Sequence, residues 1–464
     1  MDYLASLSSS VGTFLWPFRY QKLEYGHIRL CRLQRSTSTQ HKHSDGIIRL
    51  ELKHHKFTLG RNKAEIPEYT ALSYTWGKAT LAHTILINGR RFRIRENLHC
   101  FLRRLVSSHT PALDQNEGED GDDGTTWFWI DQICIDQSNI SERNSQVRRM
   151  HEICNNASAV RVWLGESDAS TERAFFVLSA LVSAQKRRIM SRPRSEMQDD
   201  SPLPDTVEIP EDYRRRGQAL FEANPAWSDA LSDLFGRPYW TRQWIVQEVW
   251  FARVLDLQCG HSMLRQEDCL KPEGPTEIEQ QNQQQIVDRN AVFISGLAYA
   301  MDCWISHVDG ERAAIGARPV VHPQSLFSCP QVMHSVTEPY ASLYEALRRW
   351  RGQCADPRDR IFALDGLVAP SQRVLVDYSI AVVDVFWIAI AHLFVDGRPD
   401  ELDEMVLSVI QGLCVDMEIA RYGVEIGEVL HYVRAIYEER GWVWRPEAAS
   451  EIGQELGSRW TEHG

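Results

Sequence analysis

The sequence has too little positive charge for a nucleic-acid-binding protein. Its 464 residues include 51 Lys and Arg against 63 Asp and Glu, which gives a formal net charge of −12. The basic clusters at residues 90–95 and 213–217 are short and are typical of solvated helix or strand faces. We therefore expect no nucleic-acid partner.

Patterns for metal binding, secretion and membrane insertion are also missing. The ten cysteines form no CxxC pair and no Cys/His cluster at metal-ligand spacing, which predicts reduced thiols and no metal site. The first 18 residues lack the basic start and long apolar stretch of a cleavable signal. The most apolar run, residues 374–395, contains Asp377, Asp384 and His392, which favours a buried helix over a membrane span. These absences predict a cytoplasmic protein.

No glycine-rich phosphate loop is present. Residues 165–170 precede a predicted helix but lack both GxGxxG and the GK[ST] ending, which excludes the usual dehydrogenase and kinase sites. The acidic segment 114–124 lacks the spacing of a calcium loop and is typical of a solvated connection. We expect no bound cofactor.

The sequence is rich in tryptophan, with 15 residues, and 43% of it is apolar. Its length predicts two domains. Strands are predicted at residues 27–35, 46–55, 69–77, 127–130 and 159–165, together with a hairpin at 83–94 that turns at Asn88-Gly89. Helices are predicted at residues 97–107, 139–157 and 170–185, as a pair within 227–253, and over most of the chain after residue 290.

The helix at 139–157 has a clear predicted start. Asn139 can cap its first turn, and Glu142, three residues later, can reach back to the cap. The alternation of strands and helices through residue 185 predicts an α/β fold with an open, mostly parallel sheet flanked by helices. The C-terminal region is expected to be mainly helical.

Three long stretches carry a family resemblance: "YTALSYTWG" (69–77), "FWIDQICIDQSNISERNSQVRRMHEICNNASAVRVWLG" (128–165) and "RPYWTRQWIVQEVWFAR" (237–253). In order and spacing they resemble the signature blocks of the fungal heterokaryon incompatibility (HET) domain. The flanking "HIRLCRL", "DPRDRIFALDGL" and "VDYS" also resemble that family. One departure is Asp365, where the family typically has an apolar residue.

The resemblance implies a HET domain at 66–254, preceded by a leader and lead-in strands at 1–65 and followed by a mainly helical region at 255–464. It implies a role in non-self recognition, in which the domain triggers programmed cell death when incompatible fungal cells fuse. HET domains also resemble Toll/interleukin-receptor-type (TIR) domains, which implies a TIR- or flavodoxin-like core. Some TIR domains cleave NAD with a single helical glutamate.

The matching glutamate here is Glu248. It follows Trp244 by four residues, and Trp244 follows Trp240 by four, so we expect all three on one helical face. A carboxylate beside indoles can hold a ribose hydroxyl and stabilise the positive charge that forms as nicotinamide leaves. Glu248 is therefore the predicted catalytic residue, with NAD as substrate.

The other blocks are expected to complete the cleft, because ligands gather beyond the carboxyl ends of strands in open α/β sheets. The predicted substrate-binding residues are Ser73, Tyr74, Trp76, Asp131, Gln132, Asp136, Arg143, Trp240, Arg242 and Trp244. Arg143 or Arg242 is expected to meet the pyrophosphate.

Structural interpretations compete with each of these roles. Asp131 and Asp136 also suit helix-entry or turn positions, residues 356–360 suit a salt-bridged helix entry, and Glu248 suits a structural ion pair. Cys134 lies between isoleucines, which favours an inert buried thiol over a nucleophile. Two functions therefore stay open: an NAD glycohydrolase, and a non-enzymatic signalling module that acts by self-association and recruitment, so a protein partner or a second copy of the chain is expected.

Overall fold

The computed structural model describes residues 16–34, 47–57, 66–108, 126–190, 211–271, 289–314, 342–370, 373–394 and 404–441. The acidic segment 114–124, predicted to be a solvated loop, lies outside the described residues. Among the described helices, none combines the length and apolar character needed to cross a bilayer.

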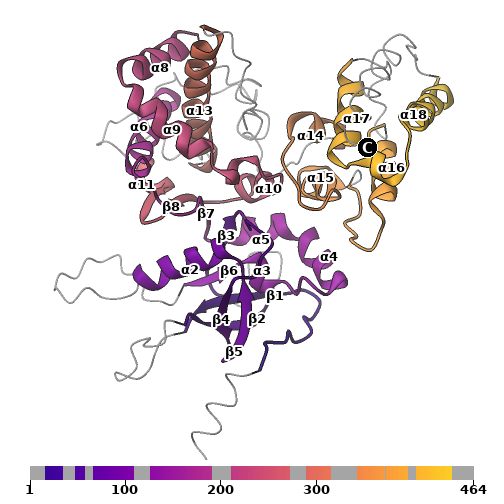
Figure 1. Ribbon diagram of the computed structural model, residues 1–464, viewed down its shortest axis with the longest axis horizontal. Helices are drawn as coiled ribbons and strands as arrows, with labels where there is room; N and C mark the ends of the chain where they lie inside the picture. The colour runs from indigo at the N-terminus through magenta and orange to yellow at the C-terminus, as the bar shows by residue number, and fades with distance from the viewer. Residues whose placement is uncertain are drawn as a thin grey trace, which may run out of the picture.

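A single nine-stranded sheet organises the described N-terminal half (Figure 1). Its strands run in the order β5-β4-β2-β1-β6-β3-β7-β8-β9. They are β1 (His27–Leu33), β2 (Arg49–Lys56), β3 (Tyr69–Tyr74), β4 (His83–Ile87), β5 (Arg90–Ile94), β6 (Trp127–Trp129), β7 (Ala159–Trp163), β8 (Leu255–Cys259) and β9 (Ser262–Arg265).

The centre of the sheet is parallel. β3 pairs in parallel with β6 on one side and β7 on the other, and β7 pairs in parallel with β8. Counted along the chain, these four strands lie in the order 2-1-3-4, which is how a flavodoxin-like sheet begins. Antiparallel neighbours flank this centre, with β1 beside β6 and β9 beside β8. The predicted α/β class is confirmed, and the complete sheet is mixed.

The sequence explains these strands. All residues of β3 and β6 are buried, as expected for central strands covered on both faces. The predicted hairpin turn joins β4 to β5, where Asn88 (φ 49°) and Gly89 (φ 76°) both take the left-handed conformation that a type I′ turn needs. The sheet also continues past the predicted domain boundary at residue 254, because β8 and β9 extend its far edge.

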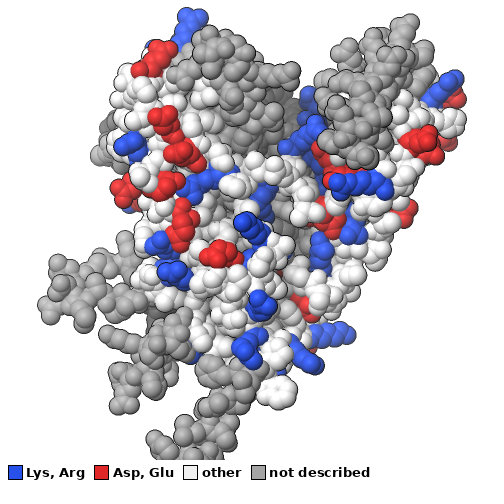
Figure 2. Space-filling view, in the orientation of Figure 1, with Lys and Arg blue, Asp and Glu red and all other residues white. Residues whose placement is uncertain are grey.

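Helices gather beside the sheet in two groups (Figure 1). One group consists of α6, α8, α9 and α13, which pack against one another. The other group, α14 to α18, lies across α10 from the first group, and Figure 2 shows both groups in the same orientation. The described helices are α2 (Glu96–Ser108), α3 (Asp131–Cys134), α4 (Ile140–Arg148), α5 (Met150–Asn156), α6 (Thr171–Met190), α8 (Glu211–Ala223), α9 (Pro225–Phe235), η2 (Pro238–Thr241), α10 (Ile245–Trp250), α11 (Gln266–Cys269), α13 (Arg289–Ala314), α14 (Leu343–Arg349), α15 (Asp359–Phe362), η5 (Asp365–Leu367), α16 (Val382–His392), α17 (Glu404–Asp416), η7 (Ile419–Tyr422) and α18 (Ile426–Arg440). The predicted helical C-terminal region is confirmed.

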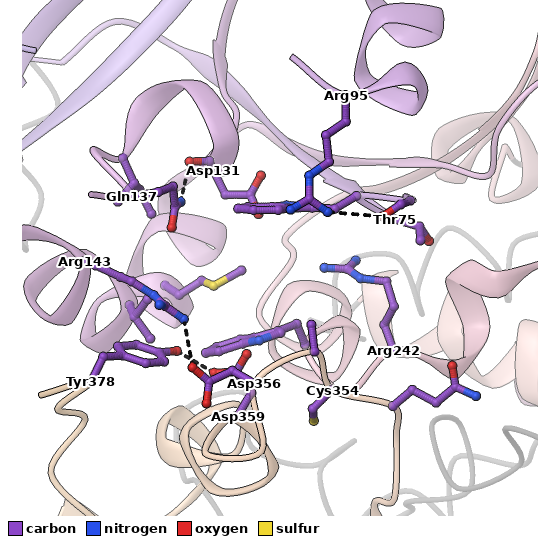
Figure 3. A pocket seen from close by; sticks show the side chains of 18 residues that line it. Thr75, Arg95, Asp131, Gln137, Arg143, Arg242, Cys354, Asp356, Asp359 and Tyr378 are labelled. Carbon is purple, nitrogen blue, oxygen red and sulfur yellow. Dashed lines mark hydrogen bonds and ion pairs between the residues drawn. The ribbon is translucent and has the colours of Figure 1, made fainter. Parts of the chain in front are cut away.

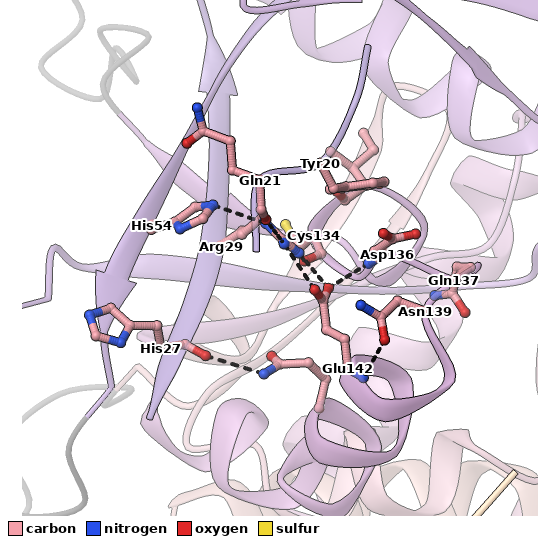
Figure 4. A network of polar contacts seen from close by, with 12 residues as sticks. Tyr20, Gln21, His27, Arg29, His54, Cys134, Asp136, Gln137, Asn139 and Glu142 are labelled. Carbon is pink, nitrogen blue, oxygen red and sulfur yellow. Dashed lines mark hydrogen bonds and ion pairs between the residues drawn. The ribbon is translucent and has the colours of Figure 1, made fainter. Parts of the chain in front are cut away.

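A buried ion pair anchors α4 to the sheet (Figure 4). Arg29 on β1 is 1% exposed and forms a two-pronged contact with Glu142, with nitrogen–oxygen distances of 2.5 and 3.0 Å. The guanidinium also donates to the carbonyl oxygens of Cys134 and Gln21. A charge this deeply buried needs such complete pairing.

The contacts around Arg29 and Glu142 also test two predictions about the start of α4. The Asn139 side chain accepts a hydrogen bond from the Glu142 backbone N–H (3.2 Å), so the predicted cap is confirmed. The prediction that Glu142 reaches back to the cap is wrong, because its carboxylate binds Arg29 and the backbone N–H of Asp136. Asp136 itself closes a turn by accepting from Ser138.

Asp365 is a poorly solvated carboxyl group in the C-terminal region. It lies in η5, and its Oδ1 is buried with no hydrogen-bond partner among the described residues. Burial raises the pKa of this carboxyl from 3.8 to about 6, although Arg373 and Arg148 act in the opposite direction. The ionised form is therefore disfavoured in the folded protein.

We expect Asp365→Leu to stabilise the protein at pH 7.5 by about 1–2 kcal/mol, because it removes a poorly solvated charge. Since the folded pKa lies above the unfolded one, the cost of this charge appears as pH rises from about 4 to above 6. The gain, measured by urea unfolding, should therefore shrink toward pH 4. Asp365→Asn separates the effect of charge from that of polarity, and an equal gain at both pH values would contradict this account.

Candidate functional site

A cavity of about 320 Å³ opens beyond the carboxyl ends of β3 and β6 (Figure 3). This is where the strand order reverses around β3, the usual place for a ligand in an open α/β sheet. Its lining consists of Thr75, Trp76, Gly77, Arg95, Asp131, Ile135, Gln137, Arg143, Val147, Met150, Arg242, Trp244, Gln353, Cys354, Ala355, Asp356, Asp359 and Tyr378. Three guanidinium groups, three carboxylates and three aromatic rings thus share one cavity.

The first wall comes from the sheet. Trp76 follows β3 and donates from its indole Nε1 to the Asp131 carboxylate, which follows β6, at 2.6 Å. The Arg95 guanidinium stacks on the Trp76 ring, 4.7 Å from its centroid, and donates to the Gly77 carbonyl oxygen. An indole held at one edge by a carboxylate and on one face by a cation is fixed in place.

The second wall comes from residues 353–378. Backbone hydrogen bonds join Gln353 to Thr241 (2.5 Å) and to Gln243 (3.1 Å), on either side of Arg242. The Asn144 side chain on α4 donates to Asp377 (2.7 Å) and accepts from the Tyr378 backbone N–H (2.9 Å). The C-terminal region is therefore bound to the segments that carry Arg242 and Arg143.

Arg143 lies at the junction of the two walls (Figure 3). Its guanidinium lies 3.4 Å from the centroid of the Tyr378 ring and 3.6 Å from the Asp356 carboxylate. The Tyr378 hydroxyl donates to Asp359 at 2.5 Å. The predicted salt-bridged helix entry is also present, because Asp356 pairs with Arg358 at 2.8 Å.

Glu248 lies behind Arg242 and is not part of the cavity lining. It is 4% exposed and contacts the Arg242 guanidinium at 3.2 and 3.4 Å. Its Oε2 also accepts a hydrogen bond from Ser73, whose hydroxyl lies 2.7 Å from that of Tyr239. In this arrangement the carboxylate is fully engaged, and Arg242 separates it from the cavity.

Two carboxyls of the cavity hold protons more tightly than usual. Burial, and then the nearby charge of Glu248, raise the pKa of Asp131 from 3.8 to about 6. Burial raises the pKa of Asp359 to about 6 as well, although hydrogen bonds from Tyr378 and Trp244 act against it. Both groups are thus suited to exchange protons near neutral pH.

Five of the eleven predicted site residues line the cavity: Trp76, Asp131, Arg143, Arg242 and Trp244. Six do not: Ser73, Tyr74, Gln132, Asp136, Trp240 and Glu248. Ser73 and Glu248 reach the cavity only through Arg242, and Gln132 is buried with its Oε1 accepting from the Arg95 backbone N–H. The structure therefore brings five of the predicted residues together in one cavity and places Ser73 and Glu248 next to its Arg242.

The prediction that Trp240, Trp244 and Glu248 lie on one helical face is wrong. Trp240 belongs to η2, Trp244 caps α10, and only Glu248 lies within α10. Trp240 is 2% exposed, and its indole donates to the Leu234 carbonyl oxygen, so it is a core residue. The turn at Arg242 breaks the helix and is what allows that side chain to enter the cavity.

Sequence reasoning missed the second wall. Asp356, Asp359 and Tyr378 belong to the family-like stretches "DPRDRIFALDGL" and "VDYS", but the sequence indicates only a local salt-bridged helix entry for residues 356–360. Gln353 and Cys354 lie just before the first stretch. Nothing in the local pattern indicates that these residues meet β3 and β6.

Comparison with known proteins gives the same domain. Residues 69–248 match the family model described as Heterokaryon incompatibility protein (HET). These residues form a HET domain. The chain is also similar to "Heterokaryon incompatibility protein 6, OR allele" of Neurospora crassa, with 28% identity over 213 residues. That match covers 43% of this chain and 30% of the relative's length. No solved structure matches significantly.

The HET domain match ends at Glu248, before the second wall of the cavity begins. The domain thus contributes Trp76, Asp131, Arg143 and Arg242, while the C-terminal region supplies Asp356, Asp359 and Tyr378. The complete cavity exists only when both regions are folded against each other.

Proposed function

We propose that this protein acts in fungal non-self recognition and that its HET domain triggers programmed cell death. The domain match and the name of the Neurospora relative support this role. The main structural support is the cavity at the carboxyl ends of β3 and β6, which the C-terminal region closes. A site that two regions share can report on their association.

We further propose that the ligand of this cavity is NAD. Arg95, Arg143 and Arg242 offer guanidinium groups to a pyrophosphate, and Trp76, Trp244 and Tyr378 offer rings for the two bases. Charged phosphates and flat rings in one molecule match the contents of the cavity.

Through Arg242, the binding of NAD would prepare Glu248 for catalysis. A pyrophosphate that takes over the Arg242 guanidinium leaves Glu248 paired only with Ser73. If the Arg242 side chain moves aside with the pyrophosphate, the carboxylate faces the cavity and can stabilise the positive charge at the ribose carbon as its bond to the nicotinamide nitrogen breaks. The bonding electrons leave with nicotinamide, and a water molecule adds to the ribose carbon and gives up a proton, for which the Asp131 carboxylate in the cavity lining is the proposed acceptor.

The purified full chain should release nicotinamide from NAD, and Glu248→Gln should reduce that release by about 100-fold or more, because it removes the stabilising charge. The assay should be run at high protein concentration in case assembly is required. Glu172→Gln, at an exposed position on α6, is the matched control and should keep full activity. Full turnover by a folded Glu248→Gln protein would exclude Glu248 as the catalytic group.

The second candidate is a non-enzymatic module that signals by self-association. The observation in its favour is the buried pairing of Glu248 with Arg242 and Ser73, which resembles a structural ion pair. This function predicts cell death that survives Glu248→Gln and no nicotinamide release by either protein. Expressing both proteins in a fungal host and scoring viability beside NAD content separates the two candidates.

A further inference from the structure

Two histidines and a glutamate converge at the start of α2, outside the cavity. His83 begins β4, and Glu96 and His99 lie three residues apart on the first turns of α2. The nitrogen and oxygen atoms that these three side chains can offer to a metal all lie within 4.8 Å of one another. We propose that His83, Glu96 and His99 bind a divalent transition metal, with Zn²⁺ as the expected ion.

The contacts among the three side chains bring them together already. His83 Nε2 lies 2.5 Å from the Glu96 carboxylate, and the His83 and His99 rings stack with centroids 3.9 Å apart and planes within 2° of parallel. A zinc ion with ligands at about 2.0–2.1 Å needs them about 3.3 Å apart, so zinc binding requires these three side chains to adjust their separations. Two imidazoles and a carboxylate are a common three-ligand set for zinc.

One atom of the group lacks a partner. His99 Nδ1 is buried and has no hydrogen-bond partner among the described residues. A buried nitrogen of this kind is costly to leave unpaired, and a metal ion would satisfy it.

The site would stabilise one wall of the cavity. The segment between β3 and His83 carries Trp76 and Gly77, and Arg95 directly precedes Glu96. A metal ion held at both His83 and Glu96 would tie these two lining segments together. The proposed zinc site takes no part in the reaction proposed for the cavity. If the protein does not bind zinc, the proposal of NAD cleavage is unaffected.

Titration of the full chain with Zn²⁺, against a competing chelator, should show one site per chain. The double variant His83→Ala/His99→Ala should bind Zn²⁺ more than about tenfold more weakly, because it removes two ligands. His431→Ala, an exposed histidine on α18, should leave the affinity unchanged. Zn²⁺ should also raise the melting temperature of the wild type but not of the double variant.

A second control concerns Cys100, whose thiol donates to Glu96 at 3.5 Å. Cys100→Ser should retain the zinc site, and Co²⁺ bound to the wild type should show no sulfur-to-metal charge-transfer band. The proposal is overturned if the double histidine variant binds Zn²⁺ as tightly as the wild type, if the wild type binds none, or if Cys100→Ser abolishes binding.

Discussion

Glu142→Ala is expected to lower the free energy of unfolding by about 3–5 kcal/mol, since it leaves a buried guanidinium without its counter-charge. Arg29 is 1% exposed, and the Glu142 carboxylate supplies two of its hydrogen bonds. The same carboxylate accepts from the backbone N–H of Asp136, so the turn into α4 loses support as well. Urea unfolding followed by tryptophan fluorescence measures the loss.

The matched control lies on the same strand. Arg32 pairs with Glu51 across β1 and β2 at 2.7 Å, but both side chains are about one-third to one-quarter exposed. Glu51→Ala should therefore cost at most about 1 kcal/mol. The double variant Arg29→Met/Glu142→Leu should recover much of the lost stability, because it removes both buried charges. Equal losses for Glu142→Ala and Glu51→Ala would contradict the role assigned to burial.

Arg242→Met is the second substitution expected to have a large effect, with a loss of about 3–5 kcal/mol at pH 7. Glu248 is 4% exposed, and among the described residues Arg242 is its ion-pair partner, so the substitution would leave its charge buried with the Ser73 hydroxyl as its remaining contact. Arg434→Met provides a control, because the Arg434–Glu438 pair on α18 is more than half exposed and should contribute less than about 0.5 kcal/mol.

A double-mutant cycle separates stability from function at this pair. Arg242→Met/Glu248→Leu should regain most of the stability, because two residues in direct contact couple strongly. It should still lack nicotinamide release and should bind NAD more weakly than Glu248→Gln, which keeps the cavity guanidinium. A double variant no more stable than Arg242→Met alone would show that the ion pair is not what Arg242 contributes.

The local elements could be predicted because short-range chemistry decides them. The apolar runs of β3 and β6, the Asn88-Gly89 turn and the Asn139 cap all depend on residues within a few positions of one another. The strand and helix alternation likewise predicted the α/β class. Family resemblance indicated the HET domain, whose family model matches residues 69–248.

The roles of charged side chains could not be predicted in this way. Glu142 has the spacing of a capping residue, yet a guanidinium from β1, more than 100 residues earlier, binds it more strongly than the cap does. Trp240, Trp244 and Glu248 have helical spacing, yet the backbone is extended at Arg242, where Gln353 pairs with the residues on either side. His83, Glu96 and His99 show no metal-ligand pattern until β4 is placed against α2.

The sequence by itself determined strands β1 to β7, the Asn139 cap and the Asn88-Gly89 turn, because these depend on neighbours along the chain, and its long motifs indicated the family of the domain. Only the tertiary structure decided which charges are buried together, that Glu248 lies behind Arg242, and that residues 353–378 close the cavity. The physical reason is that electrostatic pairing and burial depend on distance in space, and the groups that meet here come from segments far apart in the sequence.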